Sequence, residues 1–460
     1  MSDVQILDPW RTELRATLQL AAPLALANIL WMAIGTTDVI FVAMLGQAQL
    51  AASSLAVTQY MLISWALTGL TGAVAPLVAA ELGKRQHAVR EVRRSVRMAL
   101  WLAIATGLLG VMLCSWGEEF MRLTGQDPEI SRHAGSFLNI IKWAIPAMVI
   151  SSVQRTFVAA LGRPLLATGI TAAAIVINAL GNWALIFGHL GLPAMGLEGS
   201  ALASVITAIS MVGAYALVIA CDRRLSRYRL MGNWWRPEWQ RLRELIRIGL
   251  PIACIIIAEG GFFSSAAYLM GRIGAAQLAA HTIALQIAAL AFQVPFGVGQ
   301  AATIRVGYHY GAGSREGVRL AGLAALWTAF GFSFVGASIM LLFPHRVLAL
   351  YVDVADPANT ELVTLAVRYL AVAALFQMFD GIQAVGAGAL RGLQDTRMPM
   401  ALALFGYWLP GFGLSLGLGL FTPLGGLGVW IGLAVGLIVV AALLLQRWHG
   451  RERLGLLPGQ

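Results

Sequence analysis

Charged residues are scarce in this chain, and their scarcity excludes a water-soluble protein. Only 12% of the 460 residues are charged, whereas 58% are hydrophobic; soluble proteins carry about 25% charged residues. A soluble chain of this length could not remove so much apolar surface from water. The hydrocarbon of a lipid bilayer is the solvent that fits this composition.

Cysteine and reactive motifs are also nearly absent. The three cysteines, Cys114, Cys221 and Cys254, show no spacing typical of a metal site, a redox motif or a disulfide framework. The sequence contains neither a phosphate-cradling glycine loop nor a Ser–His–Asp set. We therefore expect no enzyme activity and no cofactor. Without an ATP-binding domain, any transport cycle must draw its energy from an ion gradient or a partner.

Long apolar segments dominate what remains. A helix needs about 20 apolar residues to cross a bilayer, so the pattern predicts an all-α integral membrane protein with twelve transmembrane helices. The chain also has 50 glycines, and small residues let membrane helices pack closely. The predicted spans are 16–45, 50–80, 95–116, 130–160, 164–188, 197–221, 242–272, 277–308, 318–343, 362–390, 398–420 and 424–447.

Basic residues gather in a few short connectors between these spans. The formal net charge is +10, but we do not expect nucleic-acid binding, because Lys and Arg mark the cytoplasmic loops of membrane proteins. The same bias predicts that both termini are cytoplasmic. The connector 222–243 is the most basic, and its Trp234 and Trp235 are expected at the level of the lipid headgroups.

The chain repeats itself at a shift of 228 residues. The segment Leu45–Ala52 matches Ile273–Ala280 at six of eight positions, and chance does not explain such a match. The same shift relates Pro23 to Pro251, Gly69 to Gly297 and Gly83 to Gly311, and a shift of 229 relates Gly196 to Gly425 and Gly199 to Gly428.

The repeat predicts two six-helix lobes related by a pseudo-two-fold axis along the membrane normal, with a substrate path at their interface. The predicted domains are an N-lobe at 1–221, a basic cytoplasmic linker at 222–243 and a C-lobe at 244–460 with a short C-terminal tail.

Nearly all acidic residues lie in connectors or at the ends of the predicted spans, and the three that do not are Asp38, Glu259 and Asp380. A carboxylate within the membrane costs about 2.5 kcal/mol or more, so it is usually functional and faces a cavity. The alternative is a structural ion pair with a buried base, for which Lys142, Arg155 and Arg368 are the candidates inside the spans, and the sequence pairs none of them. A carboxylate that binds H⁺ or Na⁺ in competition with an organic cation provides the physical basis of antiport. Glu259 and Asp380 are therefore candidates to bind Na⁺.

Polar and aromatic side chains accompany these acids in the spans. Asn178 and Asn182, one helical turn apart, can supply oxygen ligands to Na⁺ or interhelical hydrogen bonds. His281 and His309 are lone histidines, for which hydrogen bonding is the simpler interpretation and proton transfer the alternative. Aromatic rings can form a cation–π lining for an organic cation, with packing as the alternative for each ring. The candidates for a substrate-cavity lining are Trp31, Phe262, Phe376, Phe379, Gln377 and Gln383.

Short motifs recur in a fixed order from about Leu14 to Gln446. They are Thr37-Asp38, Pro76, Gly83, Asn178-x-x-x-Asn182 followed by Leu185-Ile186-Phe187-Gly188, Ala258-Glu259, Arg305-Val306-Gly307, Gly311-Ala312-Gly313, Gln377-x-x-Asp380-x-x-Gln383 and the segment Gly388 to Thr396. In this order the chain resembles the multidrug and toxic compound extrusion (MATE) family, specifically its NorM-like branch.

The resemblance implies a V-shaped pair of lobes that opens alternately to the two sides of the membrane. It implies export of organic cations, dyes and antibiotics in exchange for H⁺ or Na⁺. It assigns Glu259 and Asp380 to a C-lobe cation site, Asp38 to an N-lobe acid and Asn178 to an amide near that acid. Position 182 departs from a related branch, which has Asp there.

We therefore predict a monomeric, multi-pass multidrug efflux antiporter of the bacterial inner membrane. Its expected partners are organic cations and membrane lipid. The alternative is a lipid-linked precursor flippase or exporter of the same superfamily, which would need basic groups in its cavity for phosphate. The acids do not repeat: at the shift of 228, Asp38 falls on Ala266 and Glu259 on Trp31. We therefore expect ion coupling mainly in the second half.

Overall fold

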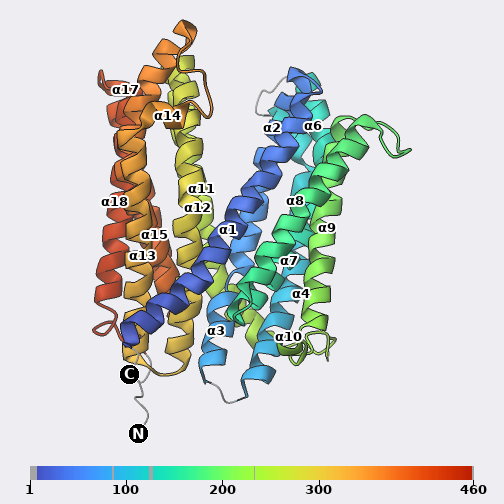
Figure 1. Cartoon of the computed structure of the whole chain (residues 1–460), viewed down its shortest axis with the longest axis vertical. Helices are drawn as coiled ribbons and strands as arrows, with labels where there is room; N and C mark the ends of the chain where they lie inside the picture. The colour runs from blue at the N-terminus through green and yellow to red at the C-terminus, as the bar shows by residue number, and fades with distance from the viewer. Residues whose placement is uncertain (1–7, 85–86, 124–127, 233, 458–460) are drawn as a thin grey trace. The chain divides into compact units, whose positions relative to one another are not determined.

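The computed structural model describes residues 8–84, 87–123, 128–232 and 234–457, and within these ranges it consists of helices joined by turns, with no strand (Figure 1). Eleven of the described helices are long and apolar enough to cross a membrane. The bent pair α6 (Pro128–Ile141) and α7 (Ala144–Ala160) makes a twelfth if it is one span. The prediction of an all-α membrane protein is confirmed, and the eleven or twelve candidate spans agree with the twelve predicted.

The predicted span 130–160 is bent by 45° between α6 and α7. Pro146 has no N–H group, so the carbonyl of Lys142 cannot accept the usual bond from four residues ahead. It accepts instead from the N–H of Ile145 at 3.1 Å. The tighter turn that results separates the two helices.

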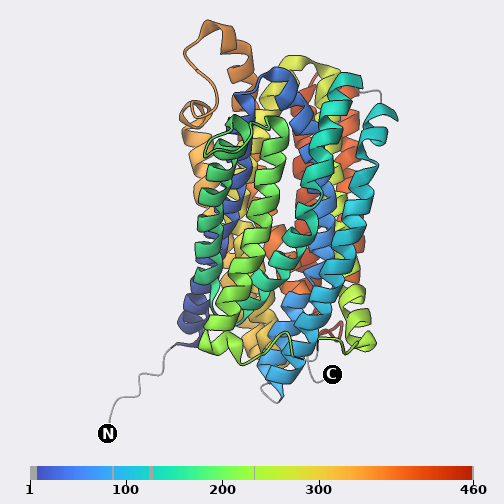
Figure 2. The same cartoon turned by 90° about the vertical axis from the view of Figure 1, so that its right-hand side faces the viewer.

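The chain forms two compact units, and unit 2 comprises Leu26–Ala253. Within it α8 packs along α9, and α7 packs against both α4 and α9, as the neighbouring ribbons in Figures 1 and 2 show. Its helices are the second part of α1 (Pro9–Ala43), α2 (Gln47–Thr71), α3 (Val74–Lys84), α4 (Ala88–Ser115), α5 (Gly117–Leu123), α6, α7, α8 (Pro164–Phe187), α9 (Leu197–Cys221), α10 (Arg223–Ser226) and the start of α11 (Trp239–Ile273).

Unit 1 comprises Met1–Ala25 and Cys254–Gln460. Its central helix is α15, which packs most extensively on α12 and also contacts α13 and α18. Besides the start of α1 and the rest of α11, its elements are α12 (Ala275–Gly311), α13 (Arg315–Leu342), α14 (Pro344–Leu348), η1 (Pro357–Asn359), α15 (Thr360–Gly392), α16 (Arg397–Gly406), the π-helical η2 (Tyr407–Phe412), α17 (Gly413–Phe421) and α18 (Gly426–His449).

The borders of the two units fall inside helices. They lie after Ala25 in α1 and after Ala253 in α11, two residues beyond the prolines Pro23 and Pro251. Residues 8–25 thus belong to the same compact unit as most of the predicted C-lobe, and residues 222–232 and 234–253 belong to the same unit as most of the predicted N-lobe. The two borders are 228 residues apart, which equals the shift of the repeat.

The repeat is also visible in the backbone before α9 and α18. Gly196 has φ 57° and ψ −129°, and Gly425 has φ 54° and ψ −127°. Side-chain-bearing residues rarely adopt this conformation. Three residues on, a Cβ on Gly199 would lie 2.6 Å from the Leu185 carbonyl oxygen, and one on Gly428 would lie 2.5 Å from that of Leu418. Both copies of the turn therefore require glycine at two positions.

A buried acid fastens the start of α1 within unit 1. Glu13 accepts hydrogen bonds from Arg305 at 2.7 and 2.5 Å, one on each carboxylate oxygen, and its Oε2 lies 3.0 Å from His309 Nε2. His309 is thus a hydrogen-bonding residue, as the simpler interpretation of the sequence expected. The burial of Glu13 could not be predicted from the sequence, because this residue lies beside the first predicted span rather than inside it.

Replacing Glu13 by alanine is expected to destabilise the protein by about 3 kcal/mol, because it leaves a partly buried guanidinium without its partner. Thermal unfolding of the purified protein measures the loss. The matched control is Glu316→Ala, which removes an acid 2.7 Å from Arg319 in a pair of exposed side chains of the same unit. This change should cost much less, because exposed ion pairs contribute little to stability. Equal losses in the two variants would contradict the role given to Glu13.

Candidate functional site

The acids predicted to be functional lie in two clusters, one in each compact unit. Asp38 lies in unit 2, whereas Glu259 and Asp380 lie together in unit 1. The two clusters differ in how their carboxylates are satisfied.

In unit 2 three neutral groups donate hydrogen bonds to Asp38. Its Oδ1 accepts from Asn178 Nδ2 at 2.9 Å and Asn182 Nδ2 at 2.7 Å, and its Oδ2 accepts from Ser204 Oγ at 2.9 Å. The two amides are fully buried on one face of α8. Ser204 of α9 was not predicted, since a single serine in an apolar span gives no distinctive signal. No cation among the described residues lies within ion-pair distance of Asp38.

In unit 1 the two acids have few partners. Asp380 of α15 is buried, and its Oδ1 has no hydrogen-bond partner among the residues that the structure describes. Glu259 of α11 is partly buried and interacts electrostatically with Asp380. Buried polar atoms in folded proteins are normally bonded to protein or water. A carboxylate oxygen left open beside a second acid is therefore suited to binding a proton or a cation.

Two glutamines continue the polar face of α15 on either side of Asp380. Gln377 is fully buried, and neither atom of its amide has a partner within the described ranges. Gln383 Nε2 donates to Tyr407 Oη at 2.6 Å, while its own oxygen has no described partner. Three buried oxygens on successive turns of one helix thus remain available as ligands.

Tyr407 is a site residue that sequence reasoning missed. It begins η2, a π-helical stretch that contains Pro410. A proline inside a helix removes one backbone hydrogen bond, and π-helical turns are frequent at functional sites. The proline marks the interruption in the sequence, but the contact with Gln383 depends on how α15 and η2 pack.

The positive charge near Glu259 comes from Arg391 of α15. The bases considered from the sequence were Lys142, Arg155 and Arg368, and two of these bond elsewhere: Lys142 donates to Asn139 Oδ1 at 2.9 Å, and Arg155 to Asn28 Oδ1 at 3.4 Å. Arg391 follows Asp380 by eleven residues. At 3.6 residues per turn this spacing places both on one face of a helix, which is the signal that could have identified it.

The predicted cavity-lining aromatics separate into two groups. Phe262 and Phe376 are fully buried, with Phe262 stacked on Tyr407 at 5.4 Å between ring centroids and Phe376 edge-on to Trp430 at 5.9 Å. Both rings belong to the hydrophobic core of unit 1. Phe379 and Trp31 are only partly buried, in unit 1 and unit 2 respectively, and their part in a lining remains a prediction.

His281 also lies in this core. Its ring is edge-on to Trp430 at 5.5 Å, and neither ring nitrogen has a partner among the described residues. The sequence analysis favoured a hydrogen-bonded His281, and no such bond is found among the described residues.

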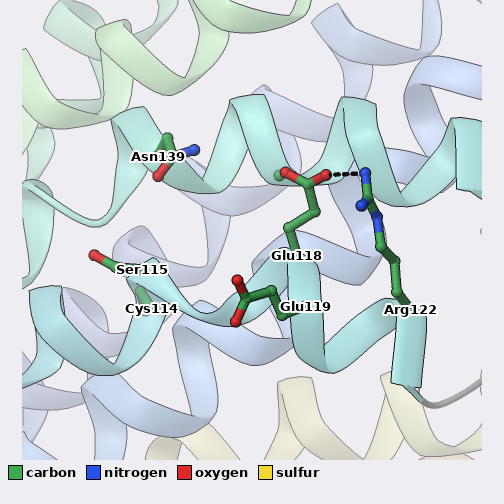
Figure 3. Close-up of a pocket in the computed structure, with 7 residues that line it drawn as sticks. Cys114, Ser115, Glu118, Glu119, Arg122 and Asn139 are labelled. Atoms are coloured by element: carbon green, nitrogen blue, oxygen red, sulfur yellow. Dashed lines mark hydrogen bonds and ion pairs between the residues drawn. The ribbon is translucent and has the colours of Figure 1, made fainter.

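A separate pocket of about 180 Å³ opens between α4, α5 and α6 of unit 2. Figure 3 shows Glu118 and Glu119 beside it, with Glu118 bonded to Arg122 at 2.6 Å. None of the predicted site residues lines this pocket. Within the described part of the chain, no three His, Cys, Asp or Glu side chains are grouped as a metal site.

Known proteins share both the repeat and the fold. The MatE family profile matches residues 23–184 and 251–416, and the two matches begin 228 residues apart, as the internal repeat does. The chain belongs to the MATE family. It is therefore a membrane transporter and not an enzyme, and the resemblance found in the sequence is confirmed.

Bacterial relatives match this MATE protein over nearly its whole length. It is 46% identical over 452 residues to the probable multidrug resistance protein NorM of Mesorhizobium japonicum, covering 97% of this chain and 95% of that one. It is 43% identical over 443 residues to the probable NorM of Brucella suis, covering 96% and 93%. Among solved structures, a multidrug resistance MATE family transporter of the MOP superfamily in an outward-facing conformation superposes with a TM-score of 0.86 at 20% identity, over 100% of both chains. This similarity shows the fold.

Proposed function

We propose that this MATE protein is a multidrug efflux transporter that expels organic cations in exchange for H⁺ or Na⁺. The observation that carries the proposal is the pair of acids Glu259 and Asp380 inside unit 1, with a carboxylate oxygen of Asp380 that has no described partner. The multidrug resistance proteins to which the chain is similar support the substrate class.

Two acids that interact within a low-dielectric interior repel each other strongly when both are ionised. Arg391 offsets part of this repulsion through its interaction with Glu259. A proton or a Na⁺ ion on the pair removes the rest. Na⁺ takes oxygen ligands, and the open oxygens of Gln377, Asp380 and Gln383 are of this kind. Loading and unloading of this site therefore changes the charge of unit 1 and can be linked to transport of a cation in the opposite direction.

The two acid clusters differ in a way that favours unit 1 as the coupling site. Asp38 already accepts three hydrogen bonds from neutral donors, so its charge is stabilised without an added ion. Asp380 lacks such donors at Oδ1 among the described residues. We therefore place coupling at Glu259 and Asp380 and give Asp38 a supporting role in unit 2, with Asn178 and Asn182 holding it.

The remaining parts of the proposal follow from the sequence. The protein is a monomer of the bacterial inner membrane with both termini in the cytoplasm, it needs no cofactor besides its coupling ion, and it does not bind nucleic acid. A lipid-linked precursor exporter would require basic groups for phosphate, whereas the predicted site residues are acids, amides and aromatics.

Everted membrane vesicles that contain the protein test the proposal. A fluorescent organic cation is loaded, and a Na⁺ gradient and a pH gradient are imposed in separate experiments. We expect dye movement to respond to at least one gradient, and the one that drives it identifies the coupling ion. Vesicles without the protein serve as the control. Dye movement that ignores both gradients would refute ion-coupled antiport.

A further inference from the structure

The acids at the linker end of unit 2 are all engaged by bases. This end comprises the adjoining ends of α3 and α4 together with α10 and the start of α11; Figure 1 shows α3, α4 and α10 there. Arg241 lies 3.2 Å from Glu81, 2.6 Å from Glu91 and 3.0 Å from Glu244, and Arg97 lies 2.5 Å from Glu238.

The remaining acid, Asp222, is also engaged. It caps α10 by accepting from the backbone N–H of Arg224, which holds the pKa of its carboxyl below the ordinary value, and it pairs with Arg163 at 3.3 Å. No acid here is left to balance further positive charge.

Several arginines on the same end are exposed and have no such partner. None of them lies within ion-pair distance of an acid in the described part of the chain, so the surface carries an uncompensated positive charge. These residues are Arg90, Arg227, Arg229, Arg236, Arg243 and Arg247.

The linker that carries part of this surface is fastened to α4. Glu238 pairs with both Arg94 and Arg97 of α4, and Trp234 packs on Trp101 with 6.4 Å between ring centroids. The linker between α9 and α11 is thus fixed on unit 2 by ion pairs and an aromatic contact.

The outward face of α11 relates these charges to the bilayer. Trp239, Arg243, Ile246, Arg247 and Leu250 are all exposed, and their spacing of three and four residues places them on one helix face. The apolar pair Ile246 and Leu250 suits contact with hydrocarbon. Tryptophan favours the membrane–water interface, and Trp239 is 68% exposed. Along α11, Arg243 follows Trp239 and precedes Ile246. Arg247 comes between Ile246 and Leu250.

We propose that Arg243 and Arg247, flanked by Trp239, bind the phosphate of an anionic phospholipid in the leaflet on the linker's side. Arginine donates two parallel hydrogen bonds to a phosphate, and its aliphatic stem can lie along acyl chains while its charged end reaches the headgroup. Phosphatidylglycerol supplies both the phosphate and the net negative charge. The uncompensated arginines nearby strengthen the attraction over the range of a Debye length.

Titration of the purified full-length protein with phosphatidylglycerol or phosphatidylcholine, read by native mass spectrometry and by thermal midpoint, tests this site. Wild type should bind phosphatidylglycerol more tightly and gain thermal stability from it. The double variant Arg243→Gln/Arg247→Gln should bind it roughly tenfold more weakly or worse, since each surface arginine contributes about a factor of five. The Arg243→Lys/Arg247→Lys variant keeps the charge and should retain most of the binding.

The matched control removes two exposed arginines of unit 1, Arg315 and Arg453, by the same change to glutamine, and should leave phosphatidylglycerol binding unchanged. Equal binding of the two lipids by wild type would overturn the proposal, and so would equal losses in the control and the site variant. Displacement of the lipid by millimolar inorganic phosphate would also overturn it, because the site would then recognise the free anion.

Discussion

Asp380→Asn should abolish gradient-driven dye efflux and leave the protein folded. Asparagine has nearly the same shape but cannot carry the charge that a proton or Na⁺ must neutralise. The Oδ1 atom of Asp380 has no described hydrogen bond to lose, and removing the charge relieves its repulsion with Glu259. We therefore expect efflux at the level of vesicles without protein, at least tenfold below wild type, and a thermal midpoint at or above that of wild type.

Two further variants complete this test. Glu259→Gln removes the other charge of the pair and should give the same loss of efflux. Glu361→Gln changes an exposed acid in the first turn of the same helix α15 and should transport normally. Wild-type efflux from folded Asp380→Asn protein would show that the coupling ion binds elsewhere.

Gly388→Val is expected to prevent folding of unit 1. Gly388 of α15 lies against the backbone of Gly299 of α12, and its carbonyl accepts a hydrogen bond from Thr303 Oγ1 at 2.9 Å. A Cβ on Gly388 would overlap the carbonyl oxygen of Gly299. Extra atoms in a packed interior cost about 1–3 kcal/mol, and because backbone yields less than a side chain, we expect about 3 kcal/mol or more.

The control for this change is Gly331→Val in α13. Gly331 also lies within a helix, but a Cβ there meets nothing within 4 Å, so the two substitutions share the change in helix propensity and differ only in packing. The yield of monodisperse protein in size-exclusion chromatography, together with the thermal midpoint, measures the difference. Comparable yields would mean that the close approach of α12 and α15 is not needed for folding.

The sequence predicted the features that depend on local composition. The length of apolar segments indicated the spans, the identities at a shift of 228 indicated the repeat, and the scarcity of charge within spans singled out Asp38, Glu259 and Asp380. Each of these signals is carried by the residues themselves. The hydrogen bonds from Asn178 and Asn182 to Asp38 depend on more than local composition. They form because α8 turns the face that carries both amides toward α1.

The features that depend on packing between distant helices could not be predicted. Ser204 and Tyr407 are single polar residues in apolar spans, and only the neighbours of α9 and η2 give them a role. The positions of Phe262 and Phe376 also depend on packing between distant helices. Both residues were predicted as candidates for a cavity lining, with packing as the alternative, and their burial in the core depends on contacts with Tyr407 and Trp430.

The borders of the two compact units have a consequence for how a chain with a single copy of the repeat could fold. The sequence repeat begins afresh in each half, yet each unit takes the first part of one long helix from the other half of the chain. One copy of the repeat therefore does not coincide with one compact unit, because each unit also contains the first part of a long helix from the other half of the chain. An ancestor encoded by a single copy would have had to pair with a second copy that lent it this segment, as domain-swapped dimers do. Fusion of two such copies would place both exchanged segments in one chain, which is the arrangement seen here.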